Sequence, residues 1–259
     1  MSISQYSLAS LFLIASINDI QLGSATGFIV NRNGKNFLIT NWHVLAGRNP
    51  STGQPTNNSG GIPNNITVHF VNNHTPSSIE WVPIKIMITD SEGKPLWLEH
   101  PVHTRSVDVV ALELDNLENY KIIQYELNPQ NPIMRVRVAN DLSIIGFPFG
   151  ISAGGLFGIW LRGSIASEPT LNYENLPSFL IDARTRQGQS GSPVISYSSG
   201  GLVELENGDT SLLGETVNLQ GVYSGRINKE SDIGIVWKKS VITEIIDGGK
   251  LGNNHLMAS

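Results

Sequence analysis

Three polar side chains, His43, Asp108 and Ser190, are of the types that together carry out acyl transfer. A serine hydroxyl becomes a nucleophile when a neighbouring base takes its proton. Histidine suits that task because its ordinary pKa lies near neutrality, so it can accept the proton and return it to a leaving group. A carboxylate that accepts the second ring N–H of the histidine fixes the tautomer that this chemistry needs.

The segment around Ser190 has the backbone freedom that such a nucleophile requires. Gly188 and Gly191 bracket the pair Gln189-Ser190. Glycine on both sides lets the chain turn sharply without a side chain that blocks an approaching substrate. Backbone N–H groups in such a turn can point at a developing oxyanion. On its own, however, this pattern is equally that of an ordinary glycine and serine turn before a strand.

The histidine and the aspartate each occur beside an apolar run. His43 closes the apolar segment that starts at Phe37, and we expect it at the end of a strand. Asp108 opens the segment Val107–Leu114, where alternation predicts that it shares a face with the apolar residues Val110, Leu112 and Leu114. A carboxylate on an apolar face needs a hydrogen-bonding partner, and a histidine N–H is a suitable one. Alone, either residue is also what a strand end or a turn commonly contains.

The order of the three residues makes the combination more specific than its parts. The order His, Asp, Ser is that of the chymotrypsin type, whereas subtilisins and α/β-hydrolases arrange the same residue types in other orders. His43 and Asp108 lie in the first half of the chain and Ser190 in the second. A cleft between two halves would bring them together.

Composition excludes several other classes of protein. Of the 259 residues, 40% are hydrophobic and 15% are charged, which predicts a folded core rather than a disordered chain. The formal net charge of −5, with no block of Lys and Arg, argues against a nucleic-acid partner. No apolar stretch approaches the roughly 20 residues that span a membrane, so we expect no membrane partner.

The cysteine count and the N-terminal segment give a prediction of compartment. The chain has no cysteine, which rules out disulfides, thiolate metal sites and cysteine nucleophiles. No Lys or Arg precedes the apolar run Leu11–Ala15, so we interpret it as a first strand rather than a secretory leader. We expect a cytoplasmic location. His100 and His103 form a His-x-x-His pair, but a clear set of further ligands is missing, so we predict no metal site and a solvated loop.

Short strands separated by turns predict an all-β fold. Asn33-Gly34 is a typical hairpin dipeptide, and the polar segment 47–65 reads as a long loop. Two prolines in the segment 128–132 predict a break between an N-terminal unit, residues 1–127, and a C-terminal unit, residues 128–259. We expect a helix over 238–246, ended by Gly248-Gly249. The predicted strands are 11–17, 21–30, 35–44, 66–71, 81–88, 107–114, 141–145, 157–166, 178–182, 193–197, 211–224 with an interruption, and 233–237.

Several of these motifs resemble those of the trypsin-like, chymotrypsin-fold serine peptidases of bacterial type. Thr40–Val44 resembles the family's Thr-Ala-Ala-His motif, and Asp108–Leu112 resembles its Asp-Ile-Ala-Leu motif. Gly188–Pro193 is similar to Gly-Asp-Ser-Gly-Gly-Pro. Ile145–Gly150 resembles a loop of HtrA-type protease domains. The likeness extends from about Gly23 to Trp237.

The resemblance implies a fold, an activity and site residues. The fold is two six-stranded antiparallel Greek-key β-barrels, the first carrying His43 and Asp108 and the second carrying Ser190, with a short C-terminal helix. The activity is hydrolysis of peptide bonds in protein or peptide substrates through an acyl-enzyme on Ser190, without a metal or other cofactor. The remaining implied site residues are the oxyanion-hole N–H groups of Gly188 and Ser190, and the substrate-binding residues Arg184, Ser224, Gly225 and Arg226.

Departures from the family pattern leave alternatives open. Gln189 stands where trypsins have the aspartate that binds the new N-terminus after zymogen cleavage, so activation of that kind is not expected. The enzyme is then either active as it stands or latent until a protein partner activates it. A catalytically inactive binding or scaffold module of the same fold is the alternative. Arg184 stands where the family places the floor of the P1 pocket, and it either pairs with an acidic P1 residue or turns outward to solvent.

Overall fold

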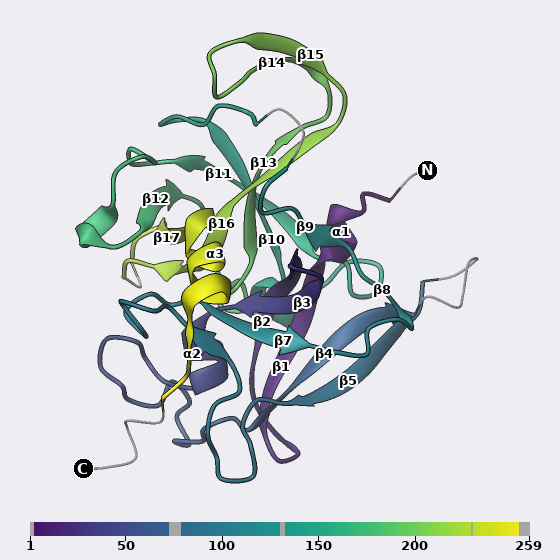
Figure 1. Cartoon of the computed structure of the whole chain (residues 1–259), viewed down its shortest axis with the longest axis vertical. Coiled ribbons are helices and arrows are strands. Elements are labelled where there is room, and N and C mark those ends of the chain that lie inside the picture. The colour runs from purple at the N-terminus through teal and green to yellow at the C-terminus, as the bar shows by residue number, and fades with distance from the viewer. Residues whose placement is uncertain (1–2, 73–78, 130–132, 229, 254–259) are drawn as a thin grey trace.

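Antiparallel strands dominate the computed structural model, which describes residues 3–72, 79–129, 133–228 and 230–253 (Figure 1). The first half of the chain forms a large sheet, and the second half forms a barrel. The helices are α1 (Tyr6–Ala9), α2 (Trp42–Ala46) and α3 (Lys239–Gly248), with short 3₁₀ turns at Pro148–Gly150 and Tyr173–Asn175. None of the helices in these ranges combines the length and the apolar character that crossing a bilayer requires.

The N-terminal sheet has ten strands in the described part of the chain. Its main path runs in the order β18-β6-β7-β3-β2-β1-β4-β5, and β8 and β9 pair beside it with β4 and β2. The strands are β1 (Ser10–Ile17), β2 (Ile20–Arg32), β3 (Lys35–Thr40), β4 (Asn65–Asn72), β5 (Trp81–Met87), β6 (Leu98–Glu99), β7 (Val110–Leu114), β8 (Tyr120–Lys121), β9 (Gln124–Tyr125) and β18 (Lys250–Leu251).

The turns of this sheet form where the sequence predicts them. Asn33 and Gly34 join β2 to β3 with φ angles of 54° and 80°, the left-handed backbone that Asn-Gly adopts in a two-residue hairpin. Asn18, also left-handed, turns β1 into β2. Between the strands, alternate apolar side chains such as Leu13 and Val68 are completely buried. The meander therefore follows from turn chemistry and alternation together.

The C-terminal half forms the closed six-stranded antiparallel barrel that we expect. Around the barrel the order is β10-β11-β12-β17-β16-β13. Its interior is apolar, with residues such as Leu142, Ile144 and Ile181 buried. A separate two-stranded hairpin, β14–β15, projects from it (Figure 1). The strands are β10 (Asp141–Gly146), β11 (Ile159–Ile165), β12 (Ser178–Asp182), β13 (Pro193–Ser198), β14 (Gly201–Glu204), β15 (Thr210–Leu213), β16 (Thr216–Arg226) and β17 (Ile233–Lys238).

The prediction of a second closed six-stranded barrel is wrong for the N-terminal half, whose sheet stays open in the described residues. Strand β5 pairs with β4 alone, so its other edge is not joined to β6. After β5 the chain turns tightly, with Asp90 accepting from the backbone N–H groups of Glu92 and Lys94. It then returns as β6, which is only two residues long and pairs with β7 and β18. So short a strand leaves no ladder to close the ring.

Helix α3 lies across the junction of the two halves. The sequence predicts this helix and its end, and Gly249 closes it with a backbone hydrogen bond to Ile245 O. Its buried residues Val241, Ile242 and Ile245 pack in one apolar cluster with residues from both halves, among them Phe28 and Ile145. The predicted break between the two units includes residues 130–132, which lie outside the described residues. The boundary at 127/128 stays a prediction.

Candidate active site

His43 lies on helix α2, immediately after the strand β3 that the sequence extends too far. The predicted strand 35–44 ends at Thr40, and the chain then makes one short helix. Gly47 ends this helix in a left-handed conformation, with its N–H donated to His43 O. The prediction of a strand-end histidine is thus wrong, because the strand ends at Thr40 and helix α2 begins at Trp42, one residue before His43. The helix aims the imidazole at Asp108.

Asp108 accepts three hydrogen bonds on its buried carboxylate. His43 donates its backbone N–H to Oδ1 over 2.9 Å and its ring Nδ1–H to Oδ2 over 2.7 Å. Ser224 Oγ donates to the same Oδ2 over 2.5 Å. Only 5% of Asp108 is exposed to solvent. The carboxylate is therefore fixed in position, and it holds the imidazole with its Nε2 as the remaining free ring nitrogen.

The alternation argument for Asp108 does not hold, although its conclusion about a histidine partner does. Strand β7 begins at Val110, so Asp108 lies before the strand rather than on one of its faces. Its backbone is held instead by Asn41, whose Nδ2 donates to Asp108 O over 2.6 Å. The side chain meets the first turn of α2, where free N–H groups are available.

The environment of His43 sets the protonation of its ring. Burial lowers the pKa of His43, since it disfavours the charged imidazolium. The negative charge of Asp108 and its hydrogen bond act in the opposite direction, and together they prevail, so the pKa is raised above its ordinary value of 6.5. The ring remains open to the cleft, with 24% of the side chain exposed. A base in this position gains strength from Asp108 and still reaches solvent.

Two glycines shape the loop that carries Ser190. Gly188 and Gly191 have φ angles of 93° and 82°, which favour glycine. A Cβ on Gly188 would lie 2.2 Å from Phe147 O, and one on Gly191 would lie 2.1 Å from Thr26 O. The bracketing glycines of the sequence are thus required by both backbone angle and space.

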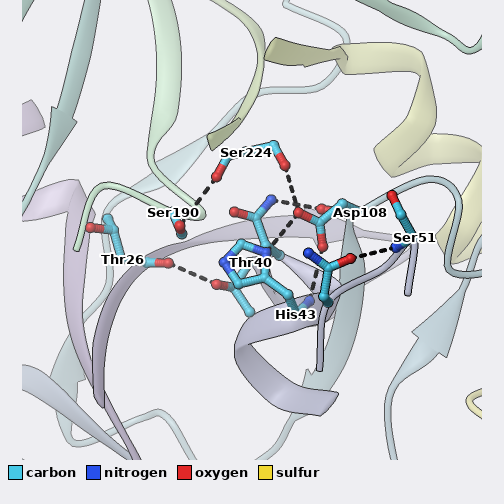
Figure 2. A network of polar contacts seen from close by, with 9 residues as sticks. Thr26, Thr40, His43, Ser51, Asp108, Ser190 and Ser224 are labelled. Atoms are coloured by element: carbon cyan, nitrogen blue, oxygen red, sulfur yellow. Dashed lines mark hydrogen bonds and ion pairs between the residues drawn. The ribbon is translucent and has the colours of Figure 1, made fainter. Parts of the chain in front are cut away.

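Strand β2 ties down the same loop. Thr26 donates its N–H to Ser190 O over 2.9 Å and its Oγ1–H to Gly188 O over 2.8 Å. Thr40 Oγ1 in turn donates to Thr26 O over 2.8 Å. These contacts connect the serine of the C-terminal half to strands of the N-terminal half. Figure 2 shows the contact between Thr26 and Thr40. Together these contacts hold Ser190 at a fixed place beside His43 and Asp108.

Ser190 does not hydrogen-bond to His43 in this structure. Its Oγ donates instead to Ser224 O over 3.1 Å. Figure 2 shows Ser224 between Ser190 and Asp108. Its carbonyl accepts from Ser190, and its hydroxyl donates to Asp108. The sequence predicts Ser224 as a substrate-binding residue but does not predict its hydrogen bond to Asp108. Rotation of the Ser190 side chain is needed to direct its proton toward Nε2 of His43.

The predicted oxyanion donors line a cleft beside Ser190. The backbone N–H groups of Gly188 and Ser190 have no acceptor among the described residues. Both residues, together with His43, border a cleft of about 490 Å³. Its other walls include the start of β2 and residues of the predicted polar loop 47–65. The cleft carries no charged side chain besides His43 when that ring is protonated, so a neutral chain fits it.

The remaining predicted substrate residues do not line this cleft. Ser224, Gly225 and Arg226 form the end of strand β16. Arg226 is half-buried and lies 4.0 Å from Asp232 Oδ1. Arg184 is exposed and does not line the cleft, which corresponds to the outward orientation. Its neighbour Thr185 points inward and hydrogen-bonds to the Tyr223 hydroxyl.

Two further expectations concern Gln189 and the histidine pair. Gln189 is completely buried, and its Oε1 accepts from Ser192 Oγ over 2.8 Å. His100 is buried rather than solvated, and its Nε2 pairs with Glu244 Oε2 over 2.8 Å. The solvated-loop interpretation is therefore wrong for His100. Among the described residues no three His, Asp or Glu side chains gather as a metal site.

Comparison with known proteins identifies the family. A model of the trypsin-like peptidase domain matches residues 25–203, which is more than half of the chain. The chain belongs to the trypsin-like peptidase family. The matched range contains all three residues of the predicted triad. No curated protein is similar enough in sequence to count as a relative.

Solved structures of bacterial serine proteases share the fold. The thermostable serine protease AL20 from an extremophilic microorganism has a TM-score of 0.52 at 12% identity, with 93% of this chain and 97% of that one covered. The active form of the Rv3671c protease from M. tuberculosis has a TM-score of 0.50 at 16% identity, with coverage of 96% and 84%. A serine endoprotease from Yersinia pestis has a TM-score of 0.50 at 16% identity, with coverage of 95% and 66%.

Proposed function

We propose that this trypsin-like peptidase is a serine endopeptidase that cleaves protein substrates through an acyl-enzyme on Ser190. The observation that carries the proposal is the pair of hydrogen bonds between His43 and Asp108. Ser190 lies beside this pair on a loop whose turn depends on Gly188 and Gly191. That arrangement supplies a base with a fixed tautomer and a nucleophile on a rigid loop.

The proposed reaction assigns a role to each of these three side chains. Ser190 Oγ attacks the carbonyl carbon of the scissile bond while His43 Nε2 takes its proton. The N–H groups of Gly188 and Ser190 receive the oxyanion. His43 then protonates the leaving amine, and the same residue activates the water that releases the acyl group. Asp108 stays ionised and stabilises the imidazolium.

The two sides of Ser190 would hold different parts of the substrate. The end of strand β16, Ser224–Arg226, adds an extended peptide by strand pairing on the acyl side. The cleft between β2 and the polar loop receives the residues after the scissile bond. Arg226, at the end of β16, supports a preference for an acidic P1 residue through charge pairing, whereas the exposed Arg184 does not contribute to it.

A catalytically inactive binding module remains the second candidate, and one contact favours it. Ser190 Oγ donates to Ser224 O rather than to His43 Nε2. An enzyme that is latent until a protein partner reorients Ser190 has the same contact. The two candidates differ in whether any condition makes Ser190 reactive.

Labelling with a fluorophosphonate probe tests the proposal directly. We expect labelling of the wild type and none of Ser190→Ala or His43→Ala. Ser91→Ala, which changes an exposed serine far from the loop in sequence, is the matched control and labels like the wild type. Loss of label in the control, or equal labelling of Ser190→Ala, would refute Ser190 as the nucleophile.

If the wild type alone stays unlabelled, it is next mixed with candidate substrates and with fractionated extracts that are searched for activators. Labelling that appears on addition identifies a latent enzyme. Its absence under every condition, with the fold intact by circular dichroism, leaves the binding module as the function.

A further inference from the structure

A second cavity lies on the other face of the helix that carries His43. Trp42, Leu45 and Ala46 are three and four positions apart, so they share one face of α2, and they line this cavity of about 250 Å³. His43 and Gly47 border the active-site cleft instead. The two hollows are therefore separated by one short helix.

The cavity contains an acidic residue that the proposed reaction does not use. Glu99, on strand β6, is 6% exposed. Its Oε1 accepts from Trp42 Nε1 over 2.8 Å and from Trp97 Nε1 over 3.2 Å. Both indoles line the cavity with it. The donors are neutral, so they satisfy an oxygen without cancelling its charge.

No cation pairs with Glu99 among the described residues. Arg48 also lines the cavity, but its Nη1 donates to Gly53 O over 3.1 Å rather than to Glu99. A buried carboxylate normally has a charged partner, because its burial alone is costly. Here the carboxylate borders a cavity of about 250 Å³.

Much of the remaining lining is aliphatic or aromatic, although Asn64, Thr89 and Asn253 also border the cavity. Ile17, Ile62 and Pro63 line the cavity beside the two indoles. Indole faces attract cations, and a carboxylate at the end of an apolar wall attracts an ammonium group. The volume is below that of a pocket for drug-sized molecules, which fixes the ligand as a small one.

We propose that this cavity is a binding site for a small organic ammonium ion, with Glu99 as its anionic partner and Trp42 and Trp97 as its aromatic walls. The ammonium group would hydrogen-bond to the Glu99 carboxylate, and a short alkyl chain would lie against Ile17 and Ile62. An anion would be repelled by Glu99. A neutral molecule of the same shape would bury the carboxylate further without a countercharge.

Calorimetric titration of the full chain with butylammonium and with 1-butanol tests the charge requirement. Ser190→Ala is used for both titrations, so that binding is measured without turnover. We expect butylammonium to bind at least tenfold more tightly than butanol. Equal affinity would overturn the proposal, because the cavity would then be merely apolar, and so would the absence of butylammonium binding.

Glu99→Gln tests the carboxylate itself. The amide oxygen still accepts from both indoles, so the pocket is retained while the charge is removed. We expect the affinity for butylammonium to fall at least tenfold while that for butanol is unchanged. Unchanged ammonium affinity overturns the proposal. The indole N–H signals in the NMR spectrum report whether the variant keeps its fold.

Arg48→Gln gives an independent answer if Glu99→Gln does not fold. Removal of this nearby cation strengthens butylammonium binding when the ligand is a cation. Unchanged or weaker binding would show that the charge of the lining does not govern recognition, and the proposal would fail. A doubly blocked lysine, N-acetyl-lysine methylamide, separates the two sources of the ammonium group: tighter binding than butylammonium indicates a peptide side chain, and weaker binding indicates a free amine.

Discussion

Two buried carboxylates flank the same short helix, and their partners differ. Asp108 contacts His43, and Glu99 contacts the preceding residue, Trp42. Both are at least nine-tenths buried, at 5% and 6% exposed. Asp108 has a partner that can carry a proton, whereas Glu99 has two indoles that cannot.

This difference shows how the partner decides what a buried acid does. The imidazole beside Asp108 changes its charge near neutral pH, so the pair can serve a reaction that moves a proton. The indole N–H groups beside Glu99 only donate. Glu99 therefore anchors Trp42 at the edge of a cavity. The predictions below test this contrast.

The largest effect is expected from Asp108→Asn. The amide forces the wrong tautomer on His43, and catalysis should fall by about 10⁴-fold, the usual cost of such a change in a serine protease triad. The rate of fluorophosphonate labelling measures it. Asp115→Asn, at an exposed position, is the control and should be unaffected. A loss of less than tenfold for Asp108→Asn would remove Asp108 from the proposed mechanism.

Glu99→Ala should affect stability more than reactivity. It leaves two buried indole N–H groups without an acceptor, at a cost of roughly 1–3 kcal/mol for each unpaired donor. We expect the free energy of unfolding in urea to fall by about 3 kcal/mol, and that of Glu99→Gln by under about 1 kcal/mol because the oxygen acceptor remains. If the two variants lose equal stability, the hydrogen bonds to Trp42 and Trp97 do not explain the anchor.

Ser224→Ala tests the third donor to Asp108. The change removes the hydroxyl and keeps the carbonyl that Ser190 contacts. A hydrogen bond to a charged group contributes roughly 1.5–3 kcal/mol, so labelling should slow by about 10- to 150-fold. Ser91→Ala is again the matched control. A labelling rate equal to the wild type would show that His43 alone suffices to orient Asp108.

The smallest effect is a displacement of the pH profile. The charge and hydrogen bond of Asp108 raise the pKa of His43 above 6.5 despite the lowering effect of burial. Only the neutral ring accepts a proton, so the labelling rate should rise with pH through a midpoint above 6.5, measured between pH 5 and pH 9. In Asp108→Asn the midpoint should move down. A wild-type midpoint below 6.5 would contradict the assignment.

The same pKa has a consequence of opposite sign for stability. Because folding raises the pKa of His43, the pair stabilises the folded chain fully below pH 6.5, and that contribution is lost as the pH rises through the folded-state value. Urea unfolding at several pH values, compared with His43→Ala, measures this contribution. The most reactive form is thus not the most stable one.

Much of the fold was predictable because local rules determine it. The left-handed Asn33-Gly34 turn, the end of α3 at Gly249 and most strands follow from turn chemistry and alternation. The open edge of the N-terminal sheet was not predictable in this way. It depends on the short length of β6, which pairs with β7 through two residues. A family resemblance does not specify the length of a single strand.

The site was predictable in its residue types and less so in its contacts. The residues His43, Asp108 and Ser190 could be predicted because their motifs are specific to the family. Thr26, which holds the Ser190 loop from strand β2, had no recognisable signal, since a threonine in a strand is commonplace. Asn41 was adjacent to His43 in a motif, but a bond from its side chain to a distant backbone carbonyl leaves no trace in spacing.

Each end of the described chain contacts the opposite half of the molecule. Near the start, Ser7 accepts from the N–H of Gly158 and from Trp160 Nε1 in the barrel, while β18 near the end pairs with β6 in the N-terminal sheet. The strand that carries Glu99 therefore acquires one of its neighbours only after the barrel has left the ribosome. Such contacts, between residues very distant in sequence, favour slow folding. They also predict that the two halves unfold in one cooperative transition, and that neither survives when expressed alone.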